Sequence, residues 1–197
     1  MTENGPPRIA VRRARVQREI LDTAWREMAR HGVAALSVRE VARGVGLRQQ
    51  SLTYYFPTKQ ALLDALFADG FAALGQEFAQ LPPPRDAAAG VVDIARAFVE
   101  HLVARPAAYH LMFQGTVPEF APSEDSHRIA LTVLQVLLDR LAAAGVTEPA
   151  DIALVRSVMS GIAAEQIAND REGHLFTDQT ERGIRAVLTS ARAAAAS

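Results

Sequence analysis

The sequence has no cysteine, a single lysine and no long apolar run among its 197 residues. Without cysteine, the chain can form no disulfide bond and no thiolate metal site, and it has no cysteine nucleophile. No segment approaches the roughly 20 apolar residues that cross a bilayer, so we expect no membrane contact and a soluble, cytoplasmic protein.

The usual catalytic and metal-binding motifs are also missing. The five histidines show no H-E-x-x-H pairing, and neither a glycine-rich phosphate loop nor a G-x-S-x-G motif occurs. The sequence therefore predicts no enzymatic activity, no cofactor and no metal ion. A small all-α enzyme stays an alternative.

Charge is distributed unevenly, although the formal net charge is only -1. Residues 1 to 59 hold 11 Lys and Arg against 5 Asp and Glu, whereas the remainder holds 10 against 17. A basic module joined to an acidic body is typical of nucleic-acid-binding proteins. Chance clustering on a solvated surface explains the same counts, so charge alone leaves both interpretations open.

Apolar residues recur at helical spacing along almost the whole chain, with no sustained period-two alternation. Glycines and prolines punctuate this pattern where helices are expected to stop. The sequence thus predicts an all-α protein with about nine helices: a first one ending at Gly32, then 37–44, 48–56, 59–80, 86–104, 107–114, 124–144, 149–170 and 178–195.

The segment 37 to 56 has the pattern of a helix-turn-helix. Ser37 and Glu40 form a capping box that starts a short helix, and Gly44 or Gly46 supplies the turn. Two short helices joined by such a turn let the second enter the DNA major groove while the first braces it. The second helix would begin near Arg48.

On a helical wheel, the apolar and polar residues of that second helix separate. Leu52, Tyr55 and Phe56 point inward, and Gln50, Ser51, Thr53 and Tyr54 point outward or sideways. Side chains at the start of such a helix suit base edges, and the later hydroxyls suit phosphates. We therefore predict base contacts by Arg48, Gln49 and Gln50, and phosphate contacts by Thr53, Tyr54 and Tyr55.

Lys59, the one lysine, falls in the first turn of the predicted helix 59 to 80. The helix dipole disfavours a cation there. A bound phosphate would make the lysine favourable at this position, because the backbone N–H groups and the ammonium would hold one anion jointly. A plain solvent-exposed lysine is the alternative.

Over about residues 18 to 62 the chain resembles the TetR family of transcriptional repressors. The resemblance lies in the run I20-L-x-x-A24…G32…S37-V-R-E-V-A42…G46-L…S51-L52…Y55-F56-P-T-K59-x-x-L62. It implies a homodimer in which residues 1–58 form the DNA-binding domain and residues 59–197 form a helical effector-binding and dimerisation domain. It also implies that the DNA-contacting region includes Ser37, Arg39, Arg48, Gln49, Gln50, Thr53, Tyr54, Tyr55 and Lys59.

Several residues depart from that family pattern. Arg48 stands where the family has a serine or threonine cap, Gln50 replaces a small residue, and Thr53 replaces a tyrosine. These positions are nearest the bases, so no known operator sequence can be transferred. Met28 replaces a phenylalanine of the first helix, which is nearly volume-conserving.

A basic arm is expected before the first helix, with Arg8, Arg12, Arg13 and Arg15. Such arms enter an adjacent minor groove or follow phosphates. A solvated tail is the alternative.

The acidic body supplies aromatic residues with a few polar neighbours, a composition that suits a ligand pocket. The predicted effector-binding residues are Phe67, Phe71, Phe98, His101, Tyr109, Met112 and Phe113. Aromatics at helical spacing are more often ordinary core. The pocket prediction therefore depends on the family resemblance.

Self-association is predicted through the last two helices, 149–170 and 178–195, whose apolar faces are wide enough for a two-fold four-helix interface. Packing within one chain explains the same faces. Taken together, the sequence predicts a dimeric, ligand-responsive repressor that binds a palindromic operator in double-stranded DNA. A helical ligand-binding or adaptor protein without a DNA target is the alternative.

Overall fold

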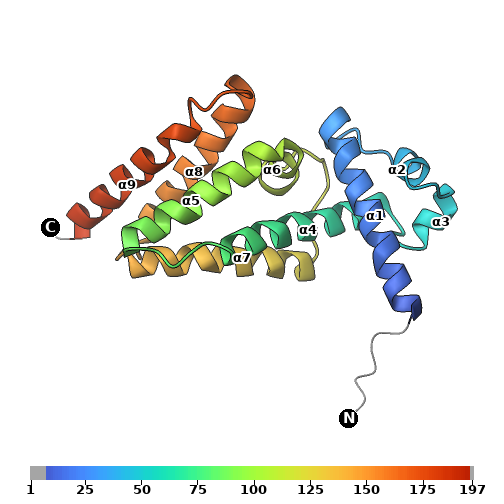
Figure 1. Cartoon of the computed structure of the whole chain (residues 1–197), viewed down its shortest axis with the longest axis horizontal. Helices are drawn as coiled ribbons and strands as arrows, with labels where there is room; N and C mark the ends of the chain where they lie inside the picture. Colours follow the sequence, from blue (N-terminus) through green and yellow to red (C-terminus); the bar gives the residue numbers. More distant parts are fainter. Residues whose placement is uncertain (1–7, 196–197) are drawn as a thin grey trace, which may run out of the picture.

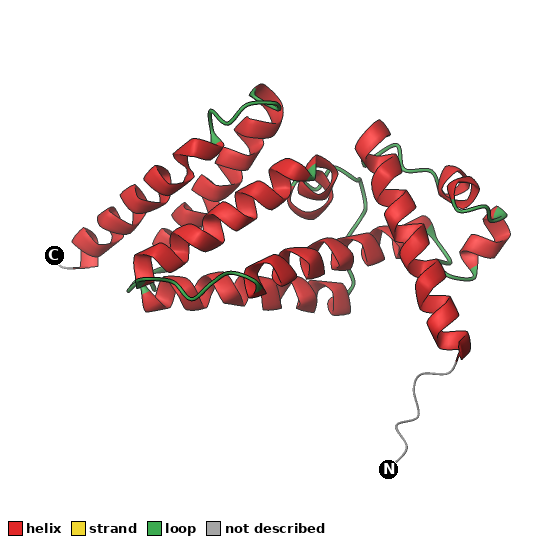
Figure 2. Cartoon of the chain, viewed as in Figure 1, coloured by secondary structure: helices red, strands yellow, loops and turns green. Residues whose placement is uncertain are grey.

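Residues 8 to 195 are described by the structure, a computed structural model of the chain, and these residues contain helices and loops but no strand (Figures 1 and 2). The all-α prediction is confirmed. The predicted helices match closely the observed ones: α1 (Arg8–His31), α2 (Val38–Gly44), α3 (Gln49–Thr53), α4 (Lys59–Ala79), α5 (Ala87–Ala104), α6 (Pro106–Phe113), α7 (Glu124–Ala143), α8 (Pro149–Asn169), the short 3₁₀ helix η1 (Thr177–Gln179) and α9 (Thr180–Ala195).

The first three helices form a unit at one end of the molecule (Figure 1), here called the head, residues 8 to 58. Helix α1 ends at Gly32, whose φ of 85° is the left-handed conformation that glycine adopts without strain. Ser37 caps α2, since its hydroxyl accepts a hydrogen bond from the Glu40 N–H at 3.4 Å. The capping box also predicts that the Glu40 carboxylate accepts from the Ser37 N–H. This half of the prediction is wrong, because the Glu40 carboxylate pairs with Arg43 instead.

The predicted basic arm is corrected for the described residues. Arg12, Arg13 and Arg15 lie in the first turns of α1, which begins at Arg8, so this part of the chain is helical rather than an extended arm. Residues 1 to 7 lie outside the described residues.

The head has its own hydrophobic core. Ile20, Ala24 and Met28 of α1 pack with Val41 of α2 and Leu52 of α3, and each of these side chains is at most 1% exposed. Met28 thus fills the core position that the sequence assigned to it. Burial of these apolar groups holds α3 against the two helices that brace it.

The remaining residues, 59 to 195, form the body. Helix α5 lies at its centre, in contact with α4, α6, α7, α8 and α9. A second hydrophobic core surrounds it and includes Ile94, Leu141, Val155 and Ile184, all fully buried.

Helix α4 belongs to both cores. Leu62, Leu63 and Leu66 in its first half pack in the head, and Phe71 and Leu74 in its second half pack in the body. The domain boundary predicted at residue 58 therefore precedes a helix that joins the two units as one rod, and the boundary itself stays a prediction. No helix within residues 8 to 195 is long and apolar enough to cross a membrane.

Candidate nucleic-acid interface and body cavity

Helix α3 presents a polar surface away from the head core. Leu52 is fully buried and Phe56 is 7% exposed, so these two side chains anchor the helix. The other side chains of the segment are exposed, and we call them the recognition face: Arg48, Gln49, Gln50, Ser51, Thr53 and Tyr54. The inward and outward sides expected from the helical wheel are thus observed, with Tyr55 half-buried between them.

Local contacts fix part of this face and leave the rest open. The Thr53 hydroxyl donates to the Gln50 carbonyl at 2.7 Å, which leaves the Thr53 oxygen free to accept. Arg48 occupies the N-cap position of α3 with an extended backbone, and its side chain makes no capping hydrogen bond. Its guanidinium and the amide of Gln49 remain available to an outside partner.

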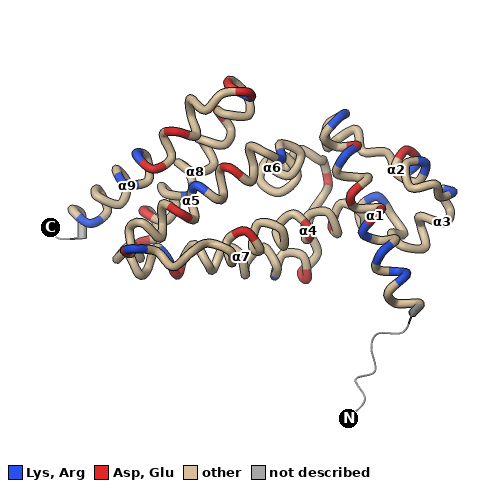
Figure 3. The backbone as a smooth tube through the Cα atoms, viewed as in Figure 1, with Lys and Arg blue, Asp and Glu red and all other residues tan. Residues whose placement is uncertain are grey.

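Tyr54 connects α3 to α1. Its ring is 68% exposed, packs edge-on against Tyr55 at 5.2 Å and lies 5.3 Å from the Arg13 guanidinium. A cation–π contact at this distance holds the Arg13 and Tyr54 side chains next to each other. The interface is therefore continuous from α3 to the first half of α1, a link that the sequence did not reveal because the two residues are 41 positions apart. Figure 3 shows Lys and Arg along α1 and at α2 and α3.

Lys59 and the residues around α2 flank the recognition face. The Lys59 ammonium donates to the Ala34 carbonyl at 3.3 Å, and its side chain is half-buried at the start of α4. Thr58 caps the same helix by accepting from the Ala61 N–H at 3.0 Å. Arg39 is exposed on α2, and Ser37 is half-buried with its hydroxyl used for the cap. The contact with Ala34 thus ties the first turn of α4 to the loop that precedes α2.

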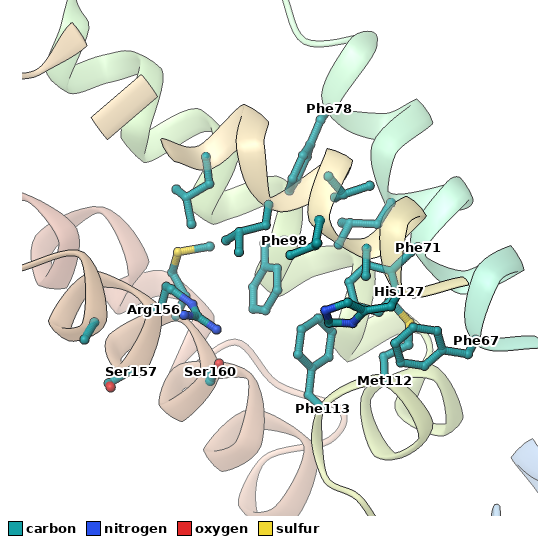
Figure 4. Close-up of a pocket in the computed structure, with 18 residues that line it drawn as sticks. Phe67, Phe71, Phe78, Phe98, Met112, Phe113, His127, Arg156, Ser157 and Ser160 are labelled. Atoms are coloured by element: carbon teal, nitrogen blue, oxygen red, sulfur yellow. The ribbon is translucent and has the colours of Figure 1, made fainter. Parts of the chain in front are cut away.

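The body forms a cavity of about 580 Å³, partly open to solvent, between α4, α5, α6, α7 and α8 (Figure 4). Of the residues predicted to bind an effector, Phe67, Phe71, Phe98, Met112 and Phe113 line it. The rings of Phe98 and Phe113 pack edge-on at 5.3 Å, and Phe71 meets Phe113 at 5.4 Å. The predicted aromatic set thus includes both core and cavity wall.

The other two predicted effector residues lie elsewhere. Tyr109 is 4% exposed and its hydroxyl accepts a hydrogen bond from Gln114; burial raises the pKa of this phenol. His101 lies beside a second cavity between α1, α4 and the corner of α5 and α6. Neither side chain lines the cavity of Figure 4, because α5 and α6 turn them toward other neighbours.

His101 is buried and lies against two charged side chains. Its Nδ1 lies 2.9 Å from Glu77 Oε1 and 3.0 Å from Arg105 Nη1, while Nε2 is buried without a hydrogen-bond partner. Burial lowers the pKa of His101 below its ordinary 6.5, and the Glu77 carboxylate opposes that effect.

Sequence reasoning missed the polar residues of the cavity. Arg156, Ser157 and Ser160 of α8 and His127 of α7 line it together with the aromatic rings. The local signal was weak: Arg156, Ser157 and Ser160 interrupt an apolar segment, and Arg156 and Ser160 are one helical turn apart. Only the fold brings that turn opposite α4 and α5.

A three-helix head whose third helix, α3, exposes a polar face, joined to a helical body with a partly open cavity, defines a helix-turn-helix regulatory protein. The family model "Bacterial regulatory proteins, tetR family" matches residues 20–66, and the model "Tetracyclin repressor-like, C-terminal domain" matches residues 91–191. The second match covers half of the chain, and the chain belongs to the TetR family of transcriptional regulators.

Proteins with related sequences are also transcriptional regulators. HTH-type transcriptional regulator Rv1816 of Mycobacterium tuberculosis is 28% identical over 135 residues, which is 66% of this chain. The chain spans 58% of the length of the curated relatives it matches.

Two solved structures show the same fold. Regulatory protein SCO4313 superposes with a TM-score of 0.75 at 23% identity, covering 93% of this chain and 100% of that one. A single-substitution variant of TetR from Acinetobacter baumannii AYE, in complex with minocycline, has a TM-score of 0.61 at 21% identity, with 87% and 93% covered.

Proposed function

We propose that the protein is a homodimeric, ligand-responsive transcriptional repressor that binds a palindromic operator. One observation carries the proposal: the recognition face is exposed along the whole of α3 while Leu52 between its residues is fully buried. A short helix anchored by one apolar side and free on its polar side is what a major-groove reader requires. A helical adaptor without a DNA target would leave this exposed polar face unexplained.

Within the interface we divide the roles by side-chain chemistry. Arg48, Gln49 and Gln50 read base edges, because arginine pairs with guanine O6 and N7 and glutamine pairs with adenine N6 and N7. The phosphate contacts belong to the remaining predicted residues, which position the head without reading sequence: Ser37, Arg39, Ser51, Thr53, Tyr54, Tyr55 and Lys59.

The dimer interface of this proposal is formed by α8 and α9. Leu154 of α8 is 46% exposed, and a Cβ added at Gly161 on the same helix would meet no atom within 4 Å. An exposed leucine and an open glycine on one helix allow a second helix to approach closely. Two copies of α8 and α9 would then form a four-helix arrangement that sets the separation of the two heads.

The effector of this repressor would occupy the body cavity and act through α4. Helix α4 carries Phe67 and Phe71 into the cavity and Leu62 and Leu66 into the head core, so a shift of α4 at one end moves the other. Gly70 supports the link, since a Cβ there would lie 2.6 Å from the Met112 sulfur of α6. A ligand that binds one arrangement of these helices more tightly shifts the population toward it.

The solved relative in complex with minocycline is a precedent for a small molecule in this family. For this chain we propose a small-molecule effector, no catalytic activity and action in the cytoplasm, where a bacterial genome lies. Its operator would have half-sites about one helical turn, or a multiple, apart.

Selection of bound sequences from random DNA duplexes tests the function directly. We expect a two-fold symmetric consensus and an affinity that falls roughly 10³-fold between low and moderate salt. Recovery of sequences without symmetry would contradict the dimeric arrangement. Recovery of no enriched sequence would contradict the proposed function and favour a helical adaptor or ligand-binding protein.

A further inference from the structure

The polar groups of the body cavity are concentrated on one helix. Arg156, Ser157 and Ser160 lie within about one turn of α8, whereas α4, α5 and α6 contribute Phe, Leu and Met side chains. In Figure 4, Arg156 and Ser160 lie on one side of the Phe98 and Phe113 rings and His127 lies on the other. The cavity therefore has an apolar interior and one side rich in hydrogen-bond donors.

Arg156 is an unmatched positive charge within the described residues. No carboxylate lies within 4.0 Å of its guanidinium, whereas Arg105 pairs with Glu77 and Arg128 pairs with Asp125. Other body arginines, such as Arg171, also lack a carboxylate partner, but among the described residues Arg156 is the unpaired arginine that lines the cavity. The body is acidic, so carboxylates are not scarce around it. An anion that enters the cavity would meet a guanidinium with all five N–H donors free.

The position of Arg156 also decides how an anion would sit. Its side chain and Ser157 are exposed at the cavity edge, while Leu74 and Met159 deeper inside are at most 2% exposed. A charged group buried among the aromatic rings would lose its hydration without a partner, whereas at the edge it keeps water and gains Arg156. The apolar part of the molecule would then fill the interior, in a volume typical of sites for drug-sized ligands.

We infer that the effector is an amphipathic organic anion, with an apolar ring or chain among Phe71, Phe98 and Phe113 and its oxyanion at Arg156 and Ser160. This inference rests on the proposed function for its regulatory meaning, but its binding chemistry is testable separately.

Two fluorescent probes differ only in the charge that matters. 8-Anilinonaphthalene-1-sulfonate carries a sulfonate, and N-phenyl-1-naphthylamine is the same aromatic body without it. Both brighten in apolar surroundings, so titration of the full chain with each gives two dissociation constants. We expect Arg156→Gln to weaken the sulfonate probe about tenfold, since it removes a charge-assisted hydrogen bond, and to leave the neutral probe within about twofold.

Two further variants localise the effect. Arg171→Gln removes an exposed arginine that does not line the cavity, so it should leave both probes unchanged and excludes a general loss of positive charge. Ala153→Trp places a large ring at the cavity edge, on an exposed position that tolerates it, and should weaken both probes.

The inference is overturned if Arg156→Gln weakens both probes equally or neither. It is also overturned if the wild type binds neither probe, or if the sulfonate probe still binds the Ala153→Trp variant at full affinity. Operator binding without any probe is measured in parallel on the wild type and Arg171→Gln, and both should bind equally. Loss of operator binding by the wild type would count against the proposed function while leaving the probe result to stand.

Discussion

The head and the body expose their functional residues in opposite ways. The recognition face is exposed, comes from one short segment and is anchored by the buried Leu52 side chain. The cavity is concave and collects side chains from five helices between Phe67 and Ser160. A partner as large as DNA fits an exposed surface and a small molecule fits a recess, so under the proposed function one chain would carry two kinds of site joined by α4.

The largest effect we expect separates these two regions. Leu52→Ala removes a fully buried side chain from the small head core and should lower the free energy of unfolding by about 2–5 kcal/mol. Operator binding should disappear, while the sulfonate probe still binds the body cavity. Chemical denaturation and the two binding assays measure this. Ser51→Ala, at the exposed neighbouring position, is the control and should leave stability within about 0.5 kcal/mol.

Should Leu52→Ala abolish probe binding as well, head and body would fold as one unit. The shared packing of α4 would then dominate over the separation of the two cores.

The next prediction tests the division of labour inside the head. Gln50→Ala should remove about 1–3 kcal/mol of discrimination at one operator position, because a bidentate amide contact to a base is lost. Lys59→Ala should weaken binding equally for all sequences and reduce the slope of log affinity against log salt by about 1. Measuring affinity for a set of operator variants at several salt concentrations distinguishes the two outcomes. Identical profiles for both variants would remove the distinction between base and phosphate contacts.

The same contrast explains what the sequence could predict. The recognition face was predictable because capping, turn and wheel rules act within about 20 consecutive residues, and Ser37 and Leu52 obey them. Most helix boundaries were predictable for the same reason, whereas the start of α1 at Arg8 was not. The cavity was predictable only as a set of aromatic residues, because whether a ring is core or wall depends on neighbours far along the chain.

His101 and Arg156 show where prediction from the sequence ends: the first was predicted and lies outside the cavity, and the second lines the cavity but was not predicted. His101 was predicted to bind an effector, and the structure places it against Glu77 beside the second cavity rather than in the cavity of Figure 4. Arg156 was not predicted, since nothing local tells that its helix faces α4 across an opening. Contacts between residues far apart in the sequence, rather than local helix propensity, determine the surroundings of both side chains.

A third, smaller effect concerns the tie between head and body. Asp69 of α4 accepts hydrogen bonds from the Trp25 indole at 2.8 Å and from Arg18 at 3.0 Å, both on α1. Asp69→Ala should lower the free energy of unfolding by about 1–2 kcal/mol. This figure is small for two lost hydrogen bonds because solvent screens the half-exposed Arg18 guanidinium. Asp22→Ala, which removes a more exposed partner of the same arginine, is the matched control and should change stability by less than about 0.5 kcal/mol. Equal losses would mean that the Trp25 hydrogen bond contributes nothing of its own.

The smallest expected effect lies where the two regions meet, and it depends on pH. Burial lowers the pKa of His101 below 6.5, so between that lowered value and 6.5 the unfolded chain binds more protons than the folded one. Stability therefore falls as pH drops below about 6.5, by at most about 1.4 kcal/mol per pH unit. His101→Gln should flatten this part of the stability profile, whereas His174→Gln, at an exposed position, should not. If the profile kept its slope in His101→Gln, the Glu77 carboxylate would balance burial, and His101 would have the same pKa in the folded and the unfolded chain.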